Sequence, residues 1–448
     1  MTPTTAERRA AAWVAGLFLM AVLLQRFAVP GLYMIALLVP AVVMWAAAAL
    51  ARGVVVVDST RLICWLTAAS LAGILMLVQS RVVVVSRVSV SSWALVFVVW
   101  LPFVLRLTQR GVPAYMAMLR HITTITTALG VASIAMIGIQ LAGVPYEDWF
   151  AQIVPKSLQL HGFNTSYPIE FGSPIYKSNA FIGLEPSIVS SLLGVGALAA
   201  ILTSAPTWKF VVLIAGLVAT VALSGMIIVF IGILVMILAP GSRRLAARYA
   251  AIFVLAALAG WFTDVGKLVF ERVGEFNSDS SSTSLRVFEP YRILLPQWTQ
   301  HLAGAVLGYG PGSSQDLANE TNIESLLVTT PAKIFFEYGL LGGLVLGGFV
   351  LVCFWGAPSR TFSISLLASI WLFQAGLATV VIVLPVLVTL TLWSPRIGKP
   401  IESPRLGGAS TPDLLQRRSD SIEPRSRLHD WTTPRLGPTA ELGLEQRM

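Results

Sequence analysis

Long apolar runs are the feature that most restricts how this chain can fold. They recur along most of the 448 residues, of which 56% are hydrophobic and only 12% are charged. A helix made from such a run can cross the hydrocarbon core of a bilayer. The runs are continuous and lack the alternation of apolar and polar residues that is typical of an outer-membrane barrel. The sequence therefore predicts an all-α polytopic membrane protein.

Counting the apolar runs predicts about twelve transmembrane helices. Two runs, 210–238 and 362–393, are too long for one ordinary helix, and we expect each to be interrupted, near Ser224-Gly225 and near Phe373-Gln374. The remaining runs each predict one helix. The predicted parts are helices one to five in 1–144, a polar loop at 145–180, helices six to nine in 181–262, a second polar loop at 263–337, helices ten to twelve in 338–393, and a tail at 394–448.

The positions of arginine and lysine predict which side of the membrane each loop faces. Basic residues concentrate in cytoplasmic connections, and placing both termini there puts most of them on that side. Arg81 and Arg87 are exceptions. Both long loops are then extracytoplasmic. The tail has few large apolar residues, and we expect it to be a disordered cytoplasmic segment. The residues assigned to the cytoplasmic side are Arg8, Arg9, Arg52, Arg61, Arg106, Arg110, Arg120, Lys209, Arg243, Arg244, Arg248, Arg360, Arg396 and Lys399.

The composition also excludes several classes of ligand. The net charge of +9 does not indicate nucleic-acid binding, because the cations lie at membrane edges and in the tail. Cys64 and Cys353 both lie in apolar runs, where a thiol behaves as a small hydrophobe. No group of residues has metal-ligand spacing, so we expect no metal and no cofactor.

The stretch 176–191 places Lys177 and Glu185 where a polar loop meets an apolar helix. Ionisable residues at such a depth are functional candidates by default. Glu185 also suits the start of a helix, where the dipole favours a negative charge, and both interpretations remain open. Ser187, Ser190 and Ser191 lie on one helical face, and we interpret them as a close contact with another helix.

Four cations lie nearest the predicted outer membrane face. They are Lys177, Arg286, Arg292 and Lys333. Together with the backbone N–H groups of the glycine-rich GYGPGSS segment that begins at Gly308, they suggest a phosphate-binding cradle. The alternative is that each extends toward lipid phosphates. The candidates for a general base are His301, Glu320 and Glu324, with Glu271 and Glu337 as further carboxylates.

Several of these motifs resemble a known superfamily. The segment KSNAFIGLEPS at 177–187 resembles the signature that opens a central helix in bacterial O-antigen ligases and Wzy-type polysaccharide polymerases. The Leu223-Ser224-Gly225 break is similar to its next element, as are the Gly308-Tyr-Gly-Pro-Gly312 turn and the FEYGLLG segment at 336–342. The similarity covers about residues 170–350.

The resemblance implies a GT-C-like, inverting, metal-independent glycosyltransferase on the periplasmic face of the bacterial inner membrane. Its donor would be a glycan on undecaprenyl pyrophosphate, and a flippase and chain-length or export proteins are possible partners. Lys177 takes the place of the family's first-loop arginine, and Arg286 or Arg292 that of its second-loop arginine. Glu185 and Lys333 complete the expected substrate-binding set.

One departure from the family pattern separates two activities. Ligases commonly carry a histidine-asparagine pair after the glycine-rich turn, whereas this chain has ETNIE at 320–324. Glu320, Glu324 or His301 would then have to act as the base. This favours an exopolysaccharide polymerase over an O-antigen ligase. A flippase for the same lipid-linked unit is the alternative from a different class, although it should have shorter outer loops.

Overall fold

The computed structural model describes residues 3–83, 88–169, 173–239, 243–262, 289–320, 328–373 and 378–395. All of these ranges belong to one compact unit, Met1–Pro404. Arg286, Glu324 and all but the first two residues of the expected tail lie outside the described residues.

The described chain is mostly helical, which confirms the predicted helical class. Three of its helices are long and apolar enough to cross a membrane: α3 (Ser59–Val82), α5 (Val112–Leu141) and α16 (Thr330–Phe354). Two antiparallel pairs of short strands accompany the helices, β1 (Ala28–Val29) with β2 (Leu32–Ala36) and β3 (Val55–Val57) with β4 (Leu105–Leu107). The other helices of the first part are α1 (Thr5–Leu24), α2 (Leu38–Ala51), α4 (Val90–Trp100) and α6 (Trp149–Ile153), and those of the later part are α7 (Pro186–Leu202), α8 (Thr207–Thr220), α9 (Leu223–Leu238), α10 (Arg243–Trp261), α13 (Glu289–Gln300), α14 (Leu302–Leu307), α15 (Ser313–Glu320), α17 (Arg360–Phe373) and α18 (Val380–Thr389).

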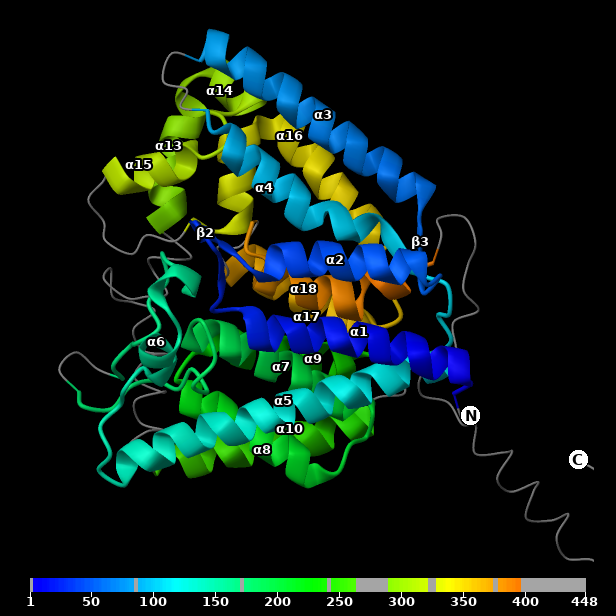
Figure 1. The fold of residues 1–448 in the computed structure, drawn as a ribbon, viewed down its shortest axis with the longest axis vertical. Helices are drawn as coiled ribbons and strands as arrows, with labels where there is room; N and C mark the ends of the chain where they lie inside the picture. The colour runs from blue at the N-terminus through cyan, green and yellow to red at the C-terminus, as the bar shows by residue number, and fades with distance from the viewer. Residues whose placement is uncertain are drawn as a thin grey trace, which may run out of the picture. The chain divides into compact units, whose positions relative to one another are not determined.

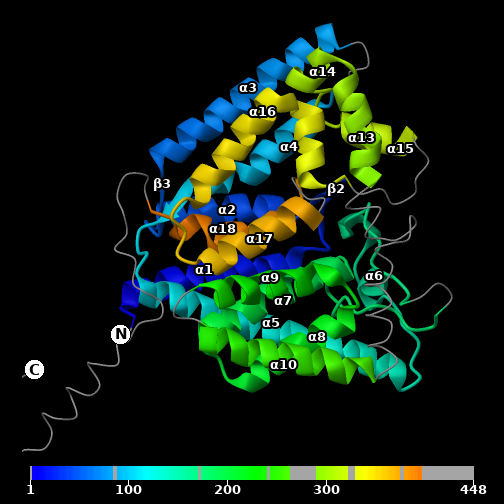
Figure 2. The ribbon, with the colours of Figure 1, turned by 180° about the vertical axis from the view of Figure 1, so that it is seen from behind.

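The long helices form two packed groups within this unit. In one group, α5 packs against α1, α7 and α8, while α9 packs against α7, α10 and α17 (Figure 1). In the other group, α16 packs against α3 and α14, and α4 lies beside them (Figure 1). The connection between α5 and α7 and the helices α13 to α15 project at the same end of these helices, as the two opposite views show (Figures 1 and 2). We call this the loop end.

Both over-long apolar runs are divided into two helices, as the sequence predicts. In the run 210–238, α8 ends at Thr220, Val221 takes a left-handed conformation with φ of 48°, and α9 begins at Leu223. A β-branched residue rarely adopts this conformation, so the surrounding packing must fix the turn. Ser224 and Gly225 lie in the first turn of α9 and not in the break itself. The run 362–393 is divided between α17 and α18.

The serine face of α7 is a helix contact, as interpreted from the sequence. The Ser190 hydroxyl donates to the Ala222 carbonyl at 2.9 Å and accepts from the Gly225 N–H at 3.0 Å. A Cβ added at Gly194 would lie 2.6 Å from the Gly225 carbonyl oxygen, which is closer than side chains approach backbone. Small residues therefore allow α7 and α9 to pack with their backbones nearly touching.

Two arginines, the buried Arg61 and the half-buried Arg110, hold the opposite end of the helices together. Arg61 is 2% exposed and donates to the carbonyls of Leu105, at 3.0 Å, and Thr391, at 2.8 Å. Arg61 and Arg110 both donate to the carbonyl of Ser394, at 3.2 Å and 2.9 Å. Arg61 therefore fastens the end of the described chain to the β3 and β4 pair, and it does not extend toward lipid headgroups.

Candidate functional site

The glycine-rich turn after α14 packs directly on a break in α16. Gly339 lies inside α16 with φ of 65° and ψ of −172°, which interrupts the helix. The N–H groups of Tyr309 and Gly310 donate to the carbonyls of Phe336 and Glu337, both at 2.9 Å. A Cβ added at Gly308 would lie 2.4 Å from the Gly339 nitrogen. The two segments thus form one unit at the loop end.

Glu337 lies at the centre of this unit. It is fully buried, and one carboxylate oxygen, Oε1, accepts a hydrogen bond from the Ser314 hydroxyl and lies 3.3 Å from the Lys333 ammonium. Its backbone carbonyl accepts from the side-chain amide of Gln79 at 3.0 Å. The other carboxylate oxygen, Oε2, has no hydrogen-bond partner among the described residues. Glu337 therefore links α15, α16 and α3, a position that the sequence did not single out from the other carboxylates.

The expected phosphate cradle is not formed by the turn's first N–H groups. Those of Tyr309 and Gly310 are already used in hydrogen bonds to α16. Lys333 is paired with Glu337, and Arg292 on α13 is paired with Glu289 at 2.7 Å while remaining 67% exposed. An anion that used either cation would have to compete with a carboxylate already in place.

The candidate bases do not gather around Glu337. His301 directly precedes α14 and is exposed, and Glu320 is the last residue of α15 and is also exposed. Neither donates to nor accepts from the Glu337 carboxylate in the described hydrogen bonds. Among the residues that the structure describes, the buried carboxylate of Glu337 and the exposed candidates His301 and Glu320 are therefore separate features, and Glu324 lies outside the described residues.

Lys177 and Glu185 lie in the connection between α5 and α7, at the loop end. Glu185 occupies the residue before α7, followed by Pro186 in the first turn, and its carboxylate accepts from the Ser187 hydroxyl at 3.1 Å. It makes no side-chain cap to the helix backbone. The Lys177 ammonium lies 5.9 Å from the centre of the Tyr167 ring. Both residues are partly exposed, so a ligand can reach them.

A buried ion pair that the sequence analysis missed fastens this connection to α1. Arg26 is 4% exposed, and its guanidinium binds both carboxylate oxygens of Asp148, one of them at 2.9 Å. Thr165 also donates to Asp148 at 2.9 Å, and Arg26 lies 4.2 Å from the Phe150 ring centre. In the predicted topology, Arg26 ends the first apolar run on the outer side of the membrane, where basic residues are less frequent. That position was the signal in the sequence that Arg26 has a partner.

The same ion pair holds a strained turn in front of Glu185. Ala180 and Phe181 have φ of 54° and 63°, which non-glycine residues seldom adopt. Arg26 donates to the Phe181 carbonyl at 3.3 Å, and the Gln25 side chain accepts from the Leu184 N–H at 3.0 Å. Such strain persists only where surrounding contacts over-determine it. The end of α1 therefore fixes the approach of the chain to α7.

The Asp148 carboxylate makes stability depend on pH in a defined direction. Burial raises the pKa of Asp148, but hydrogen bonds from Arg26 and Thr165 outweigh burial and leave the pKa below its usual value. A depressed folded-state pKa contributes stability above the unfolded pKa of about 4 and loses it as pH falls through the folded value. We expect Asp148→Asn to melt earlier than the wild type at pH 7. The difference in melting temperature should shrink as the pH falls below about 4. A constant difference across the titration would contradict this.

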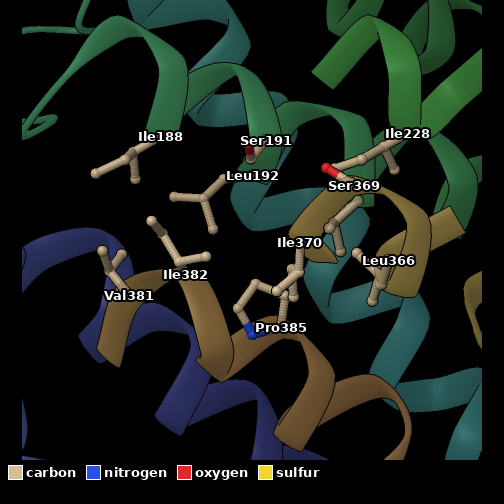
Figure 3. Close-up of a pocket in the computed structure, with 11 residues that line it drawn as sticks. Ile188, Ser191, Leu192, Ile228, Leu366, Ser369, Ile370, Val381, Ile382 and Pro385 are labelled. Atoms are coloured by element: carbon tan, nitrogen blue, oxygen red, sulfur yellow. The ribbon is translucent and has the colours of Figure 1, made fainter. Parts of the chain in front are cut away.

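One pocket among the described helices is too small for a substrate. A pocket between α7, α9, α17 and α18 has a volume of about 10 Å³, with Ser191, Leu192, Ser369 and Pro385 among the residues around it (Figure 3). This volume holds about one water molecule. A glycan or a lipid therefore does not fit in this pocket.

Comparison of the chain with protein-family models, with curated proteins and with solved structures finds no match. In the part of the chain that the structure describes, no group of three His, Cys, Asp or Glu side chains is placed to hold a metal ion.

Proposed function

We propose that this chain is a polymerase of a bacterial exopolysaccharide. It transfers a growing glycan from undecaprenyl pyrophosphate to a lipid-linked repeat unit at the periplasmic face of the inner membrane. The observation that carries the proposal is the packing of the 308–312 turn on the Gly339 break. Two of the motifs that resemble the superfamily thus meet, at the end of the helices where the connection between α5 and α7, which contains Lys177 and Glu185, also projects (Figures 1 and 2).

The proposal includes about twelve crossings in a GT-C-like arrangement, with both termini cytoplasmic. The described helices α1 to α5, α7 to α10 and α16 to α18 follow the expected order of spans. Several are apolar but only 10–17 residues long, shorter than the roughly 20 residues of a typical spanning helix. Under the proposal these helices cross a locally thin bilayer.

The reaction needs charge stabilisation and a proton acceptor. The acceptor hydroxyl oxygen bonds to the donor's anomeric carbon as the bond from that carbon to pyrophosphate breaks, with inversion. The proton passes to a base, and undecaprenyl pyrophosphate leaves. Lys177, Arg286, Arg292 and Lys333 are the proposed partners of the pyrophosphate charge, with Glu185 in the substrate-binding set. The base is proposed among Glu320, Glu324 and His301.

Complementation of a deletion strain tests this function. The strain would carry the wild type, Arg286→Ala, Arg292→Ala or Glu185→Gln, and lipid-linked oligosaccharide would be followed on the periplasmic side. We expect the deletion to accumulate single repeat units that face the periplasm, and the variants to polymerise less. Arg360→Ala, at the opposite end of the helices, is the matched control and should complement fully.

Two other outcomes would replace the proposal. Repeat units that stay on the cytoplasmic face would indicate a flippase. Long chains that form but remain on undecaprenyl pyrophosphate would indicate an O-antigen ligase, which transfers finished glycan to lipid A core. Either pattern in the deletion strain would contradict the polymerase assignment.

A further inference from the structure

An apolar cavity lies at the loop end, between segments that are far apart in the sequence. Its volume is about 140 Å³. Its walls come from β2, from the first turns of α2 and α18, from α4, and from the connection that leads to α7. Leu184, one of its lining residues, directly precedes Glu185. Representative lining side chains are those of Met34, Val39, Leu95, Phe163, Leu184 and Val381.

The chemistry of the lining suits hydrocarbon and not a polar ligand. Gln25 and Thr379 are the polar residues in a lining that is otherwise apolar. The Gln25 amide is already used, because its nitrogen donates to the Val22 carbonyl at 2.9 Å and its oxygen accepts from the Leu184 N–H at 3.0 Å. A bound water molecule needs two to four polar partners, and this lining offers few that are not already used.

The position of the cavity indicates how an occupant enters. Met34 on β2 lines the cavity while 73% of its surface is exposed, so it forms part of the rim. Leu32 on the same strand is 54% exposed. Exposed apolar side chains at a rim mark a surface that contacts lipid or an apolar partner. In a helical membrane protein, the hydrocarbon available at this place is the chain of a lipid.

We propose that this cavity binds a segment of a lipid hydrocarbon chain, with the lipid's headgroup near the start of α7. The chain passes Met34 and lies against Leu95, Val39 and Leu184. Either a phospholipid acyl chain or a polyisoprenyl chain has the required chemistry. In the second case the site would hold the lipid part of the proposed donor, and only that part of the inference rests on the proposed function.

Photo-crosslinking of the purified full-length protein tests the site. Two probes are used separately, a diazirine-bearing phospholipid and a diazirine-bearing polyprenyl phosphate, and the labelled peptides are mapped by mass spectrometry. We expect labelling of peptides that contain Leu95 or Leu184 by at least one probe. An acyl-only result assigns the site to phospholipid, and a polyprenyl result assigns it to the carrier lipid. Labelling confined to outward-facing residues such as Met44, by both probes, would overturn the proposal.

A matched pair of substitutions on α2 separates filling of the cavity from a general effect. Val39 lines the cavity, whereas Val43, one turn later on the same helix, is 39% exposed. Val39→Phe should lose most of the cavity labelling, and Val43→Phe should retain it. Equal labelling in the two variants would overturn the proposal. If Val39→Phe fails to fold, Ala36→Val provides a smaller filling of the same cavity. The readout is labelling and not polymerisation, so failure here leaves the polymerase proposal standing.

Discussion

Arg26→Ala is expected to destabilise the protein by about 3 kcal/mol, because removing one partner of a buried ion pair leaves the other charge uncompensated. Asp148 is 17% exposed and keeps its hydrogen bond from Thr165, which places the expected loss at the lower end of the usual range. The strained turn at Phe181 also loses its donor. Thermal unfolding of detergent-purified protein, followed by intrinsic tryptophan fluorescence, measures the change.

The control for this prediction is an ion pair of similar length whose arginine is exposed. The Arg292 side chain, which pairs with Glu289 at 2.7 Å, is 67% exposed, although the Glu289 side chain is 13% exposed. A solvated arginine contributes little to an ion pair, so Arg292→Ala should cost less stability than Arg26→Ala. Adding Asp148→Ala to Arg26→Ala should recover part of the loss, because the stranded carboxylate is removed. Equal losses from Arg26→Ala and Arg292→Ala would contradict the argument from burial.

Hydropathy predicted the helical class and the interruption of both over-long apolar runs, but it did not predict the helices α13 to α15, which lie in the segment 263–337 that was expected to be a polar loop. The run 210–238 exceeds one crossing, and the structure divides it at Val221. The Ser224-Gly225 pair was expected to interrupt this run. In the structure it lies in the first turn of α9, and Gly225 allows α9 to approach α7 closely. Small residues are common both where a helix is interrupted and where two helices pack closely. Only the packing in the structure shows which of these two roles Ser224 and Gly225 have.

The charges of the second loop were harder to interpret from the sequence. Residues 263–337 contain nine Asp and Glu residues and five Lys and Arg residues, so partners for its cations are plentiful. The pairs of Lys333 with Glu337 and of Arg292 with Glu289 lie four and three residues apart on helices, a spacing that brings side chains together. Because the segment was expected to be a loop, this helical spacing was not considered, and both cations were interpreted as phosphate-binding candidates.

The pair of Arg26 and Asp148 was beyond sequence reasoning. The two residues lie 122 positions apart, and no local pattern joins them. The sequence does show that Arg26 departs from the positive-inside pattern, because it ends the first apolar run on the predicted outer side. A cation there raises the expectation of a partner, but identifying Asp148 requires the fold of the connection between α5 and α7.

Gly339→Ala is expected to destabilise the protein strongly, because it combines backbone strain with a clash against backbone atoms. Gly339 combines φ of 65° with ψ of −172°, a region that is open essentially to glycine alone. The added Cβ would also lie 2.4 Å from the Gly308 nitrogen and the Val306 carbonyl oxygen. Backbone atoms cannot move aside as a flexible side chain can. The strain alone is about 1–3 kcal/mol, and the clash adds to it, so we expect little folded protein after membrane extraction.

Gly347→Ala, in the same helix, is the matched control. No atom lies within 4 Å of a Cβ built there, and its backbone is helical. Alanine is the better helix former by up to about 1 kcal/mol, so this variant should be neutral or slightly stabilised. Size-exclusion profiles and melting temperatures of both variants decide the outcome. If Gly339→Ala folds as well as Gly347→Ala, the 308–312 turn does not rest on the break in α16, and the proposed polymerase loses the observation that supports it most directly.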